Sequence, residues 1–239
     1  MAAVTPVTLY FSLLQYFGPQ KWWPVDKKYH EKNSTDPRFE IIVGAVLTQN
    51  TAWKNVEKAL ENLRSNNALT ITSIAKMDID RLSDMIKPSG YFNQKAFRLK
   101  KLSLYLQDRY NGDLNRFFNR ETVDIRNELL SLSGVGPETA DSILLYAGGH
   151  PIFVVDAYTR RICSRLPITV DGKTYDDIRQ CFERDIQRRF PTEKLVSIYG
   201  ELHALIVVFG KTFCKKKPVC RNCPMNSTCI YREKEVFSF

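Results

Sequence analysis

Four of the six cysteines lie within sixteen residues near the C-terminal end, and a set of thiols at this density could bind one metal centre. Their spacing is C-x5-C-x2-C-x5-C, formed by Cys214, Cys220, Cys223 and Cys229. Thiols stay reduced inside cells, so four of them this close together indicate metal ligation rather than disulfide bonds. Zn²⁺ and a [4Fe–4S] cluster both accept four cysteine ligands.

The arrangement of these thiols favours the iron–sulfur cluster. A zinc ribbon usually has two close Cys-x2-Cys pairs, whereas only Cys220 and Cys223 form one here, and Pro224 follows directly. We therefore predict a [4Fe–4S] cluster, with zinc as the alternative. Either metal would have all four positions filled by protein, which predicts a structural role.

A second segment with chemical potential is Leu-Ser-Gly-Val-Gly-Pro-Glu-Thr-Ala, residues 132–140. It joins two predicted helices, residues 123–132 and 138–147. Two glycines on either side of an apolar residue allow a tight turn and bring backbone N–H groups to a helix N-terminus, where a phosphate binds well. The segment predicts a helix-hairpin-helix, which contacts the DNA backbone without recognising sequence.

An aspartate follows the apolar run Ile152-Phe153-Val154-Val155. The run is β-branched enough for a strand but too short and isolated to build a sheet. Asp156 precedes a predicted helix that starts at Ala157. The carboxylate is therefore expected to be partly desolvated, and it is also a candidate helix N-cap.

The elements that must position these residues are helices. Apolar residues recur at helical spacing in at least four stretches, and Gly, Pro and Asn separate them. Representative sets are Trp53, Val56, Leu60 and Leu63; Ile79, Leu82 and Ile86; Leu99, Leu102 and Leu106; and Tyr175, Ile178, Phe182 and Ile186. We predict an all-α fold with short connections.

Composition limits the partners. Lys and Arg number 35 against 26 Asp and Glu among 239 residues, a net charge of +9 that favours a polyanion. The sequence contains no run of about 18 apolar residues that would predict a membrane span, and the N-terminus lacks the pattern of a secretory signal. We expect an intracellular protein of the cytoplasm or nucleoid, and a monomer, because no stretch has the pattern of a dimer interface.

In this order, the hairpin, the aspartate eighteen residues beyond Glu138 and the four cysteines resemble the endonuclease III superfamily of helix-hairpin-helix DNA glycosylases. Residues 47–51 (Leu-Thr-Gln-Asn-Thr) and 88–96 (Pro-Ser-Gly-Tyr-Phe-Asn-Gln-Lys-Ala) are most similar to the 3-methyladenine glycosylase branch. The resemblance spans residues 39–229.

This resemblance implies two helical domains. A six-helix barrel domain with the hairpin would comprise residues 37–149. A second domain would combine residues 1–36, which pack against the C-terminal part, with residues 150–239, which carry the catalytic aspartate and the metal loop. In this family, duplex DNA is bent and the damaged base is flipped out of the stack.

The resemblance also assigns roles. Asp156 matches the family's essential aspartate, which would stabilise the oxocarbenium-like sugar or orient the attacking water. The implied base pocket is Trp22, Trp23, Pro24 and Trp53. The implied DNA-binding residues are Gly134, Gly136 and Thr139 in the hairpin, Gln49 and Asn50 to fill the vacated duplex, Tyr91 as a wedge, and Lys95, Arg160 and Arg161 as charge donors.

Tryptophans suit an alkylated purine, because 3-methyladenine is cationic in the nucleotide. A cation on the face of a tryptophan gains about 2 kcal/mol when it is desolvated. The alternative is that these side chains simply pack in the core.

Glu138 departs from the bifunctional members, which carry a lysine there that attacks the sugar C1′. A carboxylate cannot form that Schiff base, so we predict a monofunctional glycosylase in base excision repair with little or no lyase activity. The first cysteine gap of five residues, where the family has six, is a second departure. Two alternatives remain: a mismatch glycosylase for T or U opposite G, and a non-catalytic DNA-binding module.

Overall fold

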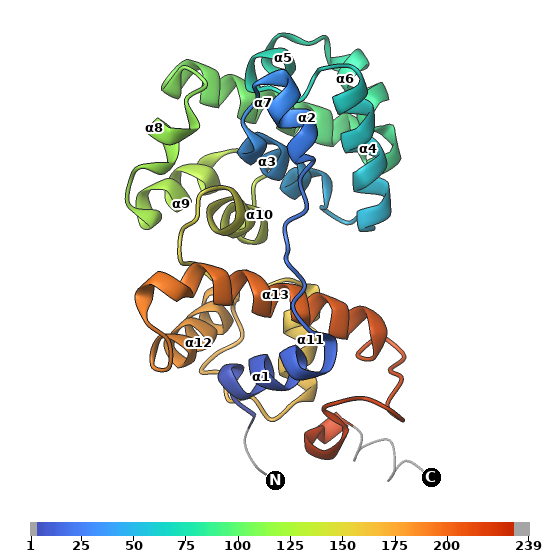
Figure 1. Cartoon of the computed structure of the whole chain (residues 1–239), viewed down its shortest axis with the longest axis vertical. Coiled ribbons are helices and arrows are strands. Elements are labelled where there is room, and N and C mark those ends of the chain that lie inside the picture. The colour runs from blue at the N-terminus through green and yellow to red at the C-terminus, as the bar shows by residue number, and fades with distance from the viewer. Residues whose placement is uncertain (1–3, 232–239) are drawn as a thin grey trace. The chain divides into compact units, whose positions relative to one another are not determined.

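Helices joined by short turns make up the computed structural model, which describes residues 4–231, and no strand occurs in that range (Figure 1). The predicted all-α fold is confirmed. The chain forms two compact units: one combines the described parts of Met1–Trp22 and Pro151–Phe239, and the other is Trp23–His150. We refer to them as the terminal unit and the central unit.

The terminal unit joins both ends of the chain. Its elements are α1 (Pro6–Phe17), α11 (Ala157–Arg165), α12 (Tyr175–Gln187), η3 (Thr192–Lys194), α13 (Leu195–Thr212) and η4 (Asn226–Thr228). α1 packs on α12 and α13, and the Asp185 carboxylate accepts a hydrogen bond from the Val7 backbone N–H at 2.9 Å. The N-terminal helix is therefore part of the same core as the C-terminal helices.

Helix α13 is the centre of the terminal unit. Among the described residues, the stretch Thr192–Thr212 is long and apolar enough by composition to cross a membrane, but 61% of its most apolar window is buried. The side chains of Leu202, Leu205 and Ile206 are fully buried in the core of this unit. Burial within the protein therefore accounts for the apolar composition of α13.

Residues 151–156, where the chain enters the terminal unit for the second time, form neither helix nor strand. Ile152, Phe153, Val154 and Val155 are each 3% exposed or less, and Phe153 stacks on Phe182 with ring centroids 4.6 Å apart. This apolar segment thus supports Asp156 through packing on α12, and it forms no strand.

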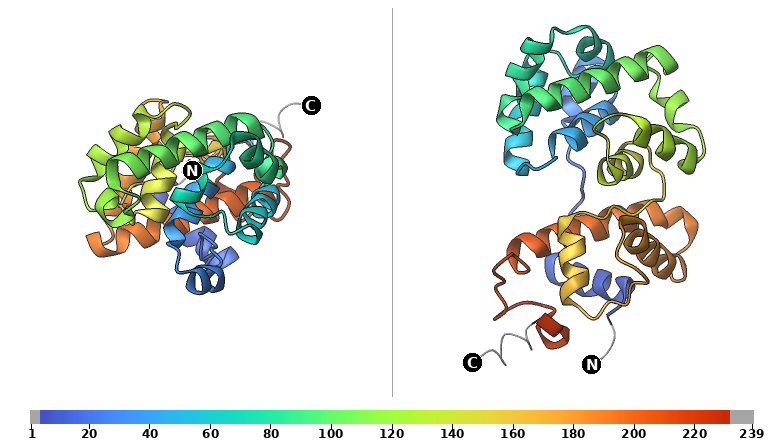
Figure 2. Two further views of the ribbon diagram at one scale, coloured as in Figure 1. Left: turned by 90° about the horizontal axis from the view of Figure 1, so that it is seen from above. Right: turned by 180° about the vertical axis from the view of Figure 1, so that it is seen from behind.

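The central unit contains α2 (Lys27–Asn33), α3 (Pro37–Leu47), α4 (Trp53–Ser65), α5 (Ile71–Lys76), α6 (Ile79–Ile86), η1 (Lys87–Ser89), α7 (Phe92–Tyr110), α8 (Leu114–Phe118), α9 (Thr122–Ser131), α10 (Pro137–Ser142) and the π-helical turn η2 (Ile143–Ala147). The long helix α7 runs across this unit (Figure 2) and packs on α3, α5, α6 and α8. Every residue of α3 from 39 to 47 is buried, so α3 is the core helix.

The predicted apolar stripes are the buried faces of these helices. Val56, Leu60 and Leu63 in α4 are at most 2% exposed, as is the stripe of α7. In α6, which packs on α7, Leu82 and Ile86 are fully buried, whereas Ile79 in the first turn is partly exposed. Trp53, at the start of α4, is only partly buried. The predicted helices over 123–132 and 138–147 correspond to α9 and to α10 continued by η2.

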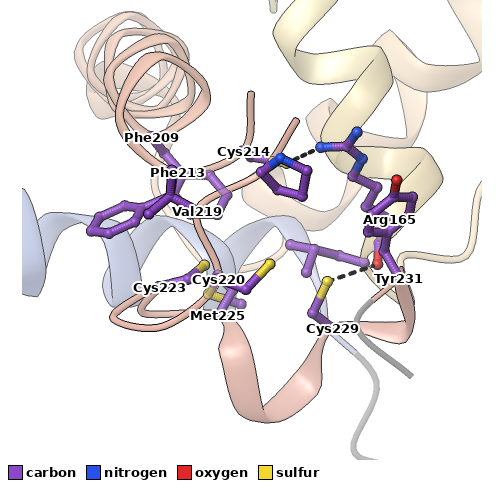
Figure 3. Close-up of a pocket in the computed structure, with 12 residues that line it drawn as sticks. Arg165, Phe209, Phe213, Cys214, Val219, Cys220, Cys223, Met225, Cys229 and Tyr231 are labelled. Atoms are coloured by element: carbon purple, nitrogen blue, oxygen red, sulfur yellow. Dashed lines mark hydrogen bonds between the residues drawn. The ribbon is translucent and has the colours of Figure 1, made fainter. Parts of the chain in front are cut away.

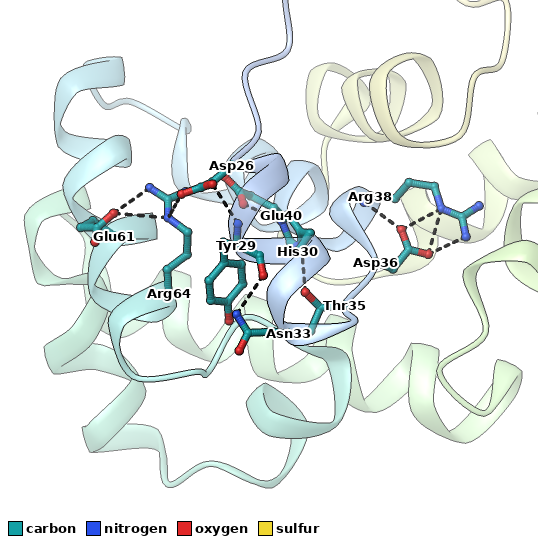
Figure 4. A network of polar contacts seen from close by, with 10 residues as sticks. All are labelled: Asp26, Tyr29, His30, Asn33, Thr35, Asp36, Arg38, Glu40, Glu61 and Arg64. Atoms are coloured by element: carbon teal, nitrogen blue, oxygen red, sulfur yellow. Dashed lines mark hydrogen bonds and ion pairs between the residues drawn. The ribbon is translucent and has the colours of Figure 1, made fainter.

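Residues 23–36 belong to the central unit rather than to the predicted N-terminal segment 1–36. A buried polar network makes the difference (Figure 4). His30 in α2 lies 2.7 Å from one Glu40 carboxylate oxygen, and Arg64 in α4 lies 2.7 Å from the other. Glu40 is 1% exposed, and a buried carboxylate needs such partners, so this network fixes α2 onto α3 and α4.

Replacing Glu40 tests the importance of this network. Glu40→Gln leaves His30 and Arg64 without their buried counter-charge, so the free energy of unfolding should fall by about 3–5 kcal/mol. Glu61→Gln is the matched control, because Glu61 pairs with the same Arg64 but its side chain is 62% exposed. The control should lose less than about 1 kcal/mol in urea denaturation. Equal losses in both variants would contradict the structural role of Glu40.

Candidate active site and nucleic-acid interface

Asp156 is the N-cap of α11, and its carboxylate is almost wholly buried, with 7% of the residue exposed. Oδ1 accepts hydrogen bonds from the Thr159 backbone N–H at 2.7 Å and from the Thr159 hydroxyl at 2.9 Å. The capping interpretation is confirmed. The same geometry also produces the desolvated carboxylate that a catalytic role would require.

The second oxygen of Asp156 faces His203 of α13, with Nε2 and Oδ2 3.7 Å apart. Burial raises the pKa of Asp156, but the interaction with His203 and the two bonds from Thr159 outweigh burial and hold the pKa below its ordinary value. The carboxylate is therefore an anion at neutral pH. Sequence reasoning missed His203, whose only signal is a histidine within the apolar helix 195–212.

The hairpin lies between α9 and α10 and is anchored by the buried side chain of Val135. Gly134 has a φ of +88°, and a Cβ at this position would come within 2.4 Å of the Arg98 side chain. Gly136 caps α10, and a Cβ there would meet nothing within 4 Å. Gly134 is thus required by backbone conformation and close packing, whereas Gly136 leaves the start of α10 open.

The Gln49 side chain is hydrogen-bonded to this hairpin. Its Nε2 donates to the Gly134 carbonyl at 3.1 Å and to the Thr139 hydroxyl at 2.9 Å, while Arg98 donates to its Oε1. Thr139 is 6% exposed, so it supports the hairpin from inside rather than contacting DNA as predicted. Asn50, with a φ of +52°, is the exposed residue of the two candidates for filling the duplex.

Tyr91, in the turn between η1 and α7, is a large side chain that is mostly exposed. It is 67% exposed and has a φ of +47° immediately before α7. This conformation projects an aromatic ring from a fixed backbone position into solvent. The predicted wedge is therefore accessible.

Lys95 is buried, and the prediction that it contacts phosphate is wrong. The residue is 1% exposed, and its ammonium donates to the Leu47 carbonyl at 2.8 Å, the Thr51 hydroxyl at 2.8 Å and the Ser89 carbonyl at 2.7 Å. These bonds join the end of α3, the turn after it and η1. Burial, followed by repulsion from Arg98, lowers the pKa of Lys95 to about 8.

The two predicted arginines of α11 differ. Arg160 is exposed and lies over the Tyr175 ring at 5.8 Å. Arg161 is partly buried, and its Nε donates to the Cys214 carbonyl at 2.6 Å. Arg161 thus supports the cysteine loop, and Arg160 is the more accessible cation.

Trp23, Trp53 and Tyr146 form an aromatic cluster in the central unit. The Trp23 ring lies 5.3 Å from the Trp53 ring, at 87°, and 5.3 Å from the Tyr146 ring. All three residues are partly exposed. A Cβ at Gly44 in α3 would lie 2.8 Å from Trp23, so this mid-helix glycine makes room for the indole.

Other predicted pocket residues are placed differently. Trp22 is partly buried and belongs to the terminal unit, and Pro24 is exposed. Tyr146 was not predicted. It lies in the π-helical turn η2, an irregularity that often occurs at functional sites and that the helical spacing of residues 138–147 conceals.

The four predicted cysteine ligands line one pocket, which is partly open to solvent (Figure 3). Cys214 is 8% exposed, and Arg165 donates to its sulfur at 3.4 Å. Burial and the neighbouring thiols raise the pKa of Cys223 to about 11. Within residues 4–231, however, no three His, Cys, Asp or Glu side chains are close enough together to hold a metal ion.

The chemistry of this pocket nevertheless suits an anionic metal–thiolate centre. Four sulfur donors face an apolar wall that includes Phe209 and Phe213. The guanidinium of Arg165, 8% exposed, is fixed by the carbonyls of Lys215 at 2.6 Å and Lys216 at 3.0 Å. A buried cation beside four thiols offsets the charge that metal-bound thiolates would carry.

This combination of an all-helical fold, a helix-hairpin-helix and a buried aspartate after it defines a class of DNA repair protein. The chain belongs to the HhH-GPD superfamily of base excision DNA repair proteins, whose family model matches residues 43–188. That range includes the turn at 47–51, the hairpin and Asp156. The predicted family is therefore confirmed.

Individual relatives narrow the class to DNA glycosylases. The chain is 44% identical over 223 residues to the DNA repair glycosylase assigned in Methanocaldococcus jannaschii, covering 93% of this chain and 94% of that protein. It is 32% identical over 202 residues to endonuclease III of Thermotoga maritima, covering 84% and 86%. Among solved structures, H. pylori 3-methyladenine DNA glycosylase bound to 1,N6-ethenoadenine matches with 30% identity and a TM-score of 0.72, covering 87% and 98%.

Lys95→Met tests the buried ammonium. The substitution leaves buried carbonyls of Leu47 and Ser89 unpaired, so the free energy of unfolding at pH 7 should fall by at least about 2 kcal/mol. Lys101→Met is the control, because Lys101 is exposed on the same helix. Urea denaturation of both variants provides the measurement, and a loss no greater than that of the control would contradict the assignment.

The same pair of variants gives a pH test. The pKa of Lys95 is about 8 in the folded protein and 10.5 for an ordinary lysine, so between these values the unfolded chain binds more protons. The contribution of Lys95 to stability should therefore rise as the pH increases from about 8 to about 10, and Lys95→Met should lack this rise. The control should retain it.

Proposed function

We propose that this protein is a monofunctional DNA glycosylase that releases an alkylated purine such as 3-methyladenine from duplex DNA and leaves an abasic site. The observation that carries the proposal is the buried, ionised carboxylate of Asp156 in a chain that has Glu138 at the family's lysine position. Asp156 supplies the negative charge for hydrolysis, and Glu138 cannot supply an amine nucleophile.

Asp156 acts on the sugar. When the N-glycosidic bond breaks, its electron pair leaves with the base, and a methylated base that was cationic departs as a neutral molecule. The deoxyribose becomes oxocarbenium-like, and a nearby anion in a dry site stabilises that charge far more than it would in water. Water then adds to C1′ and loses a proton, which completes the hydrolysis.

Glu138 accounts for the absence of lyase activity in this proposal. A lyase needs a neutral amine that attacks C1′ and forms an imine, and that imine leads to strand cleavage. Glu138 is exposed at the first turn of α10, next to the hairpin glycines, and offers only a carboxylate. The buried Lys95 does not replace it, because its ammonium is bound to three oxygens within the central unit.

The aromatic cluster supports the choice of base. Trp23, Trp53 and Tyr146 are partly exposed, and an electron-poor alkylated purine binds aromatic rings by stacking and cation–π attraction. The H. pylori relative, whose name specifies 3-methyladenine, was solved with a modified adenine, which supports the same substrate class. A neutral pyrimidine would instead need polar groups that bind its Watson–Crick edge.

Contacts with DNA follow from the exposed residues. We infer that the open start of α10 at Gly136 contacts a phosphate, that Asn50 fills the vacated position in the duplex and that Tyr91 enters the opposite strand. Gln49 supports this arrangement by tying the turn that carries Asn50 to the hairpin.

Asp156→Asn tests the catalytic role without removing the helix cap, since asparagine and aspartate are comparable N-caps. The variant should lose base release from methylated duplex DNA by at least about 100-fold and keep its affinity for DNA. Asp113→Asn, at the cap of α8, is the control and should behave as wild type. The measurement is single-turnover release scored by chromatography, and release at the wild-type rate would contradict the role of Asp156.

The same assay tests the substrate. Wild-type protein should release methylated purines faster than thymine or uracil opposite guanine. The reverse order would favour the mismatch glycosylase, and DNA binding without release of any base would favour a non-catalytic module.

We further propose that Cys214, Cys220, Cys223 and Cys229 hold a [4Fe–4S] cluster. Such a centre would link the loop after α13 into one rigid structure and has no open position for chemistry. Their shared pocket and the adjacent Arg165 support the proposal.

Metal analysis tests the cluster. Protein purified without oxygen should contain iron and acid-labile sulfide at about four of each per chain. Cys220→Ser should lose both, and Cys181→Ser, a cysteine of α12 outside the pocket, should retain them. Stoichiometric zinc without sulfide would replace the cluster with the alternative metal.

A further inference from the structure

The sequence has three histidines, and their surroundings differ. His30 contacts Thr35 and Glu40, and His150 contacts Thr122 and the Phe118 carbonyl, all within the central unit. His203 is the histidine that faces Asp156. It is 8% exposed on a helix whose buried neighbours are mostly apolar, where an ionisable side chain is unfavourable unless it interacts with another polar group.

The two oxygens of Asp156 are in different situations. Oδ1 is fixed by both hydrogen bonds from Thr159 on its own helix. Oδ2 faces His203 across the packing of α11 on α13, at 3.7 Å from Nε2. Thr159 can orient the carboxylate but is not ionisable, so His203 is the ionisable side chain that faces Oδ2 in this arrangement.

We propose that His203 is a positioning residue for the glycosylase reaction: it keeps the Asp156 carboxylate charged and directs Oδ2 while the sugar becomes cationic. This inference rests on the proposed function, since it assigns Asp156 the catalytic role. The consequence is that base release depends on a residue from α13, outside residues 43–188, which the family model matches.

Other polar groups around Asp156 do not replace His203. Tyr158 follows on α11, and its pKa is raised by burial and by the charge of Asp156 itself. Arg161 lies over the Tyr158 ring at 5.0 Å. From α12, Tyr175 and Glu183 accept hydrogen bonds from the backbone N–H groups of residues 155 and 153, so they support the apolar segment 152–155.

The sign of the pH effect follows from these contacts. In the wild-type protein, burial raises the pKa of Asp156 and the interactions with His203 and Thr159 lower it further than burial raises it. Without His203, burial has less opposition and the carboxylate binds a proton at higher pH. Base release requires the anion, so its loss on acidification should begin closer to neutrality.

The experiment measures single-turnover base release across pH 4–8 in wild type, His203→Gln and His203→Asn. The acid limb should move up by about one pH unit in both variants, while release at pH 7, well above the limb, should change far less. His150→Gln is the matched control and should keep the wild-type profile. Thermal denaturation shows which variants fold. If one His203 substitution prevents folding, the other, whose side chain has a different length, still tests the proposal.

A second readout separates this inference from the proposed function. Carbon NMR of labelled aspartate, assigned with Asp156→Asn, follows the Asp156 carboxyl directly and needs no substrate. Its titration should move to higher pH in the His203 variants even if wild type releases no alkylpurine. An unchanged Asp156 titration and an unchanged acid limb in a folded His203 variant would overturn the role of His203.

Discussion

The proposed chemistry requires a carboxylate that is buried beside a reacting sugar and yet remains charged, and the terminal unit surrounds Asp156 with partners that meet this constraint. Removing a carboxylate from water costs several kcal/mol unless specific partners compensate. Here the apolar segment 152–155 holds Asp156 in place, Thr159 binds one oxygen, and His203 faces the other. Because α13 also packs on α1, the N-terminal helix belongs to the scaffold that holds Asp156.

The central unit also contains buried charged side chains that need polar partners, one at each end of α3. Glu40, near the start of this helix, joins α2 and α4 through His30 and Arg64. Lys95 binds the carbonyl at its end and connects the turn of Asn50 to η1, just before Tyr91. The two residues that we infer to enter DNA thus project from turns that a single buried ammonium links. A rigid base for these turns reduces the conformational entropy that the protein would lose on binding DNA.

Sequence patterns predicted the fold, the hairpin, the position of Asp156 and the shared location of the cysteines, because each depends on spacing within one stretch of chain. They did not predict what depends on distant segments. Lysine is usually a surface residue, and only the fold brings the oxygens of Leu47, Thr51 and Ser89 around the Lys95 ammonium. His203 and Tyr146 were missed for the same reason. The boundary near residue 22 was placed too late because the His30–Glu40 contact leaves no local signal.

The central claim is that this chain hydrolyses the glycosidic bond with one carboxylate and without an amine nucleophile. Borohydride reduction during the reaction tests it directly, because the reagent converts an imine between a lysine and the sugar into a stable protein–DNA adduct. The account predicts that 3-methyladenine is released from duplex DNA, that no adduct forms and that the strand stays intact until alkali is added. A borohydride-trapped adduct that forms together with base release would contradict it.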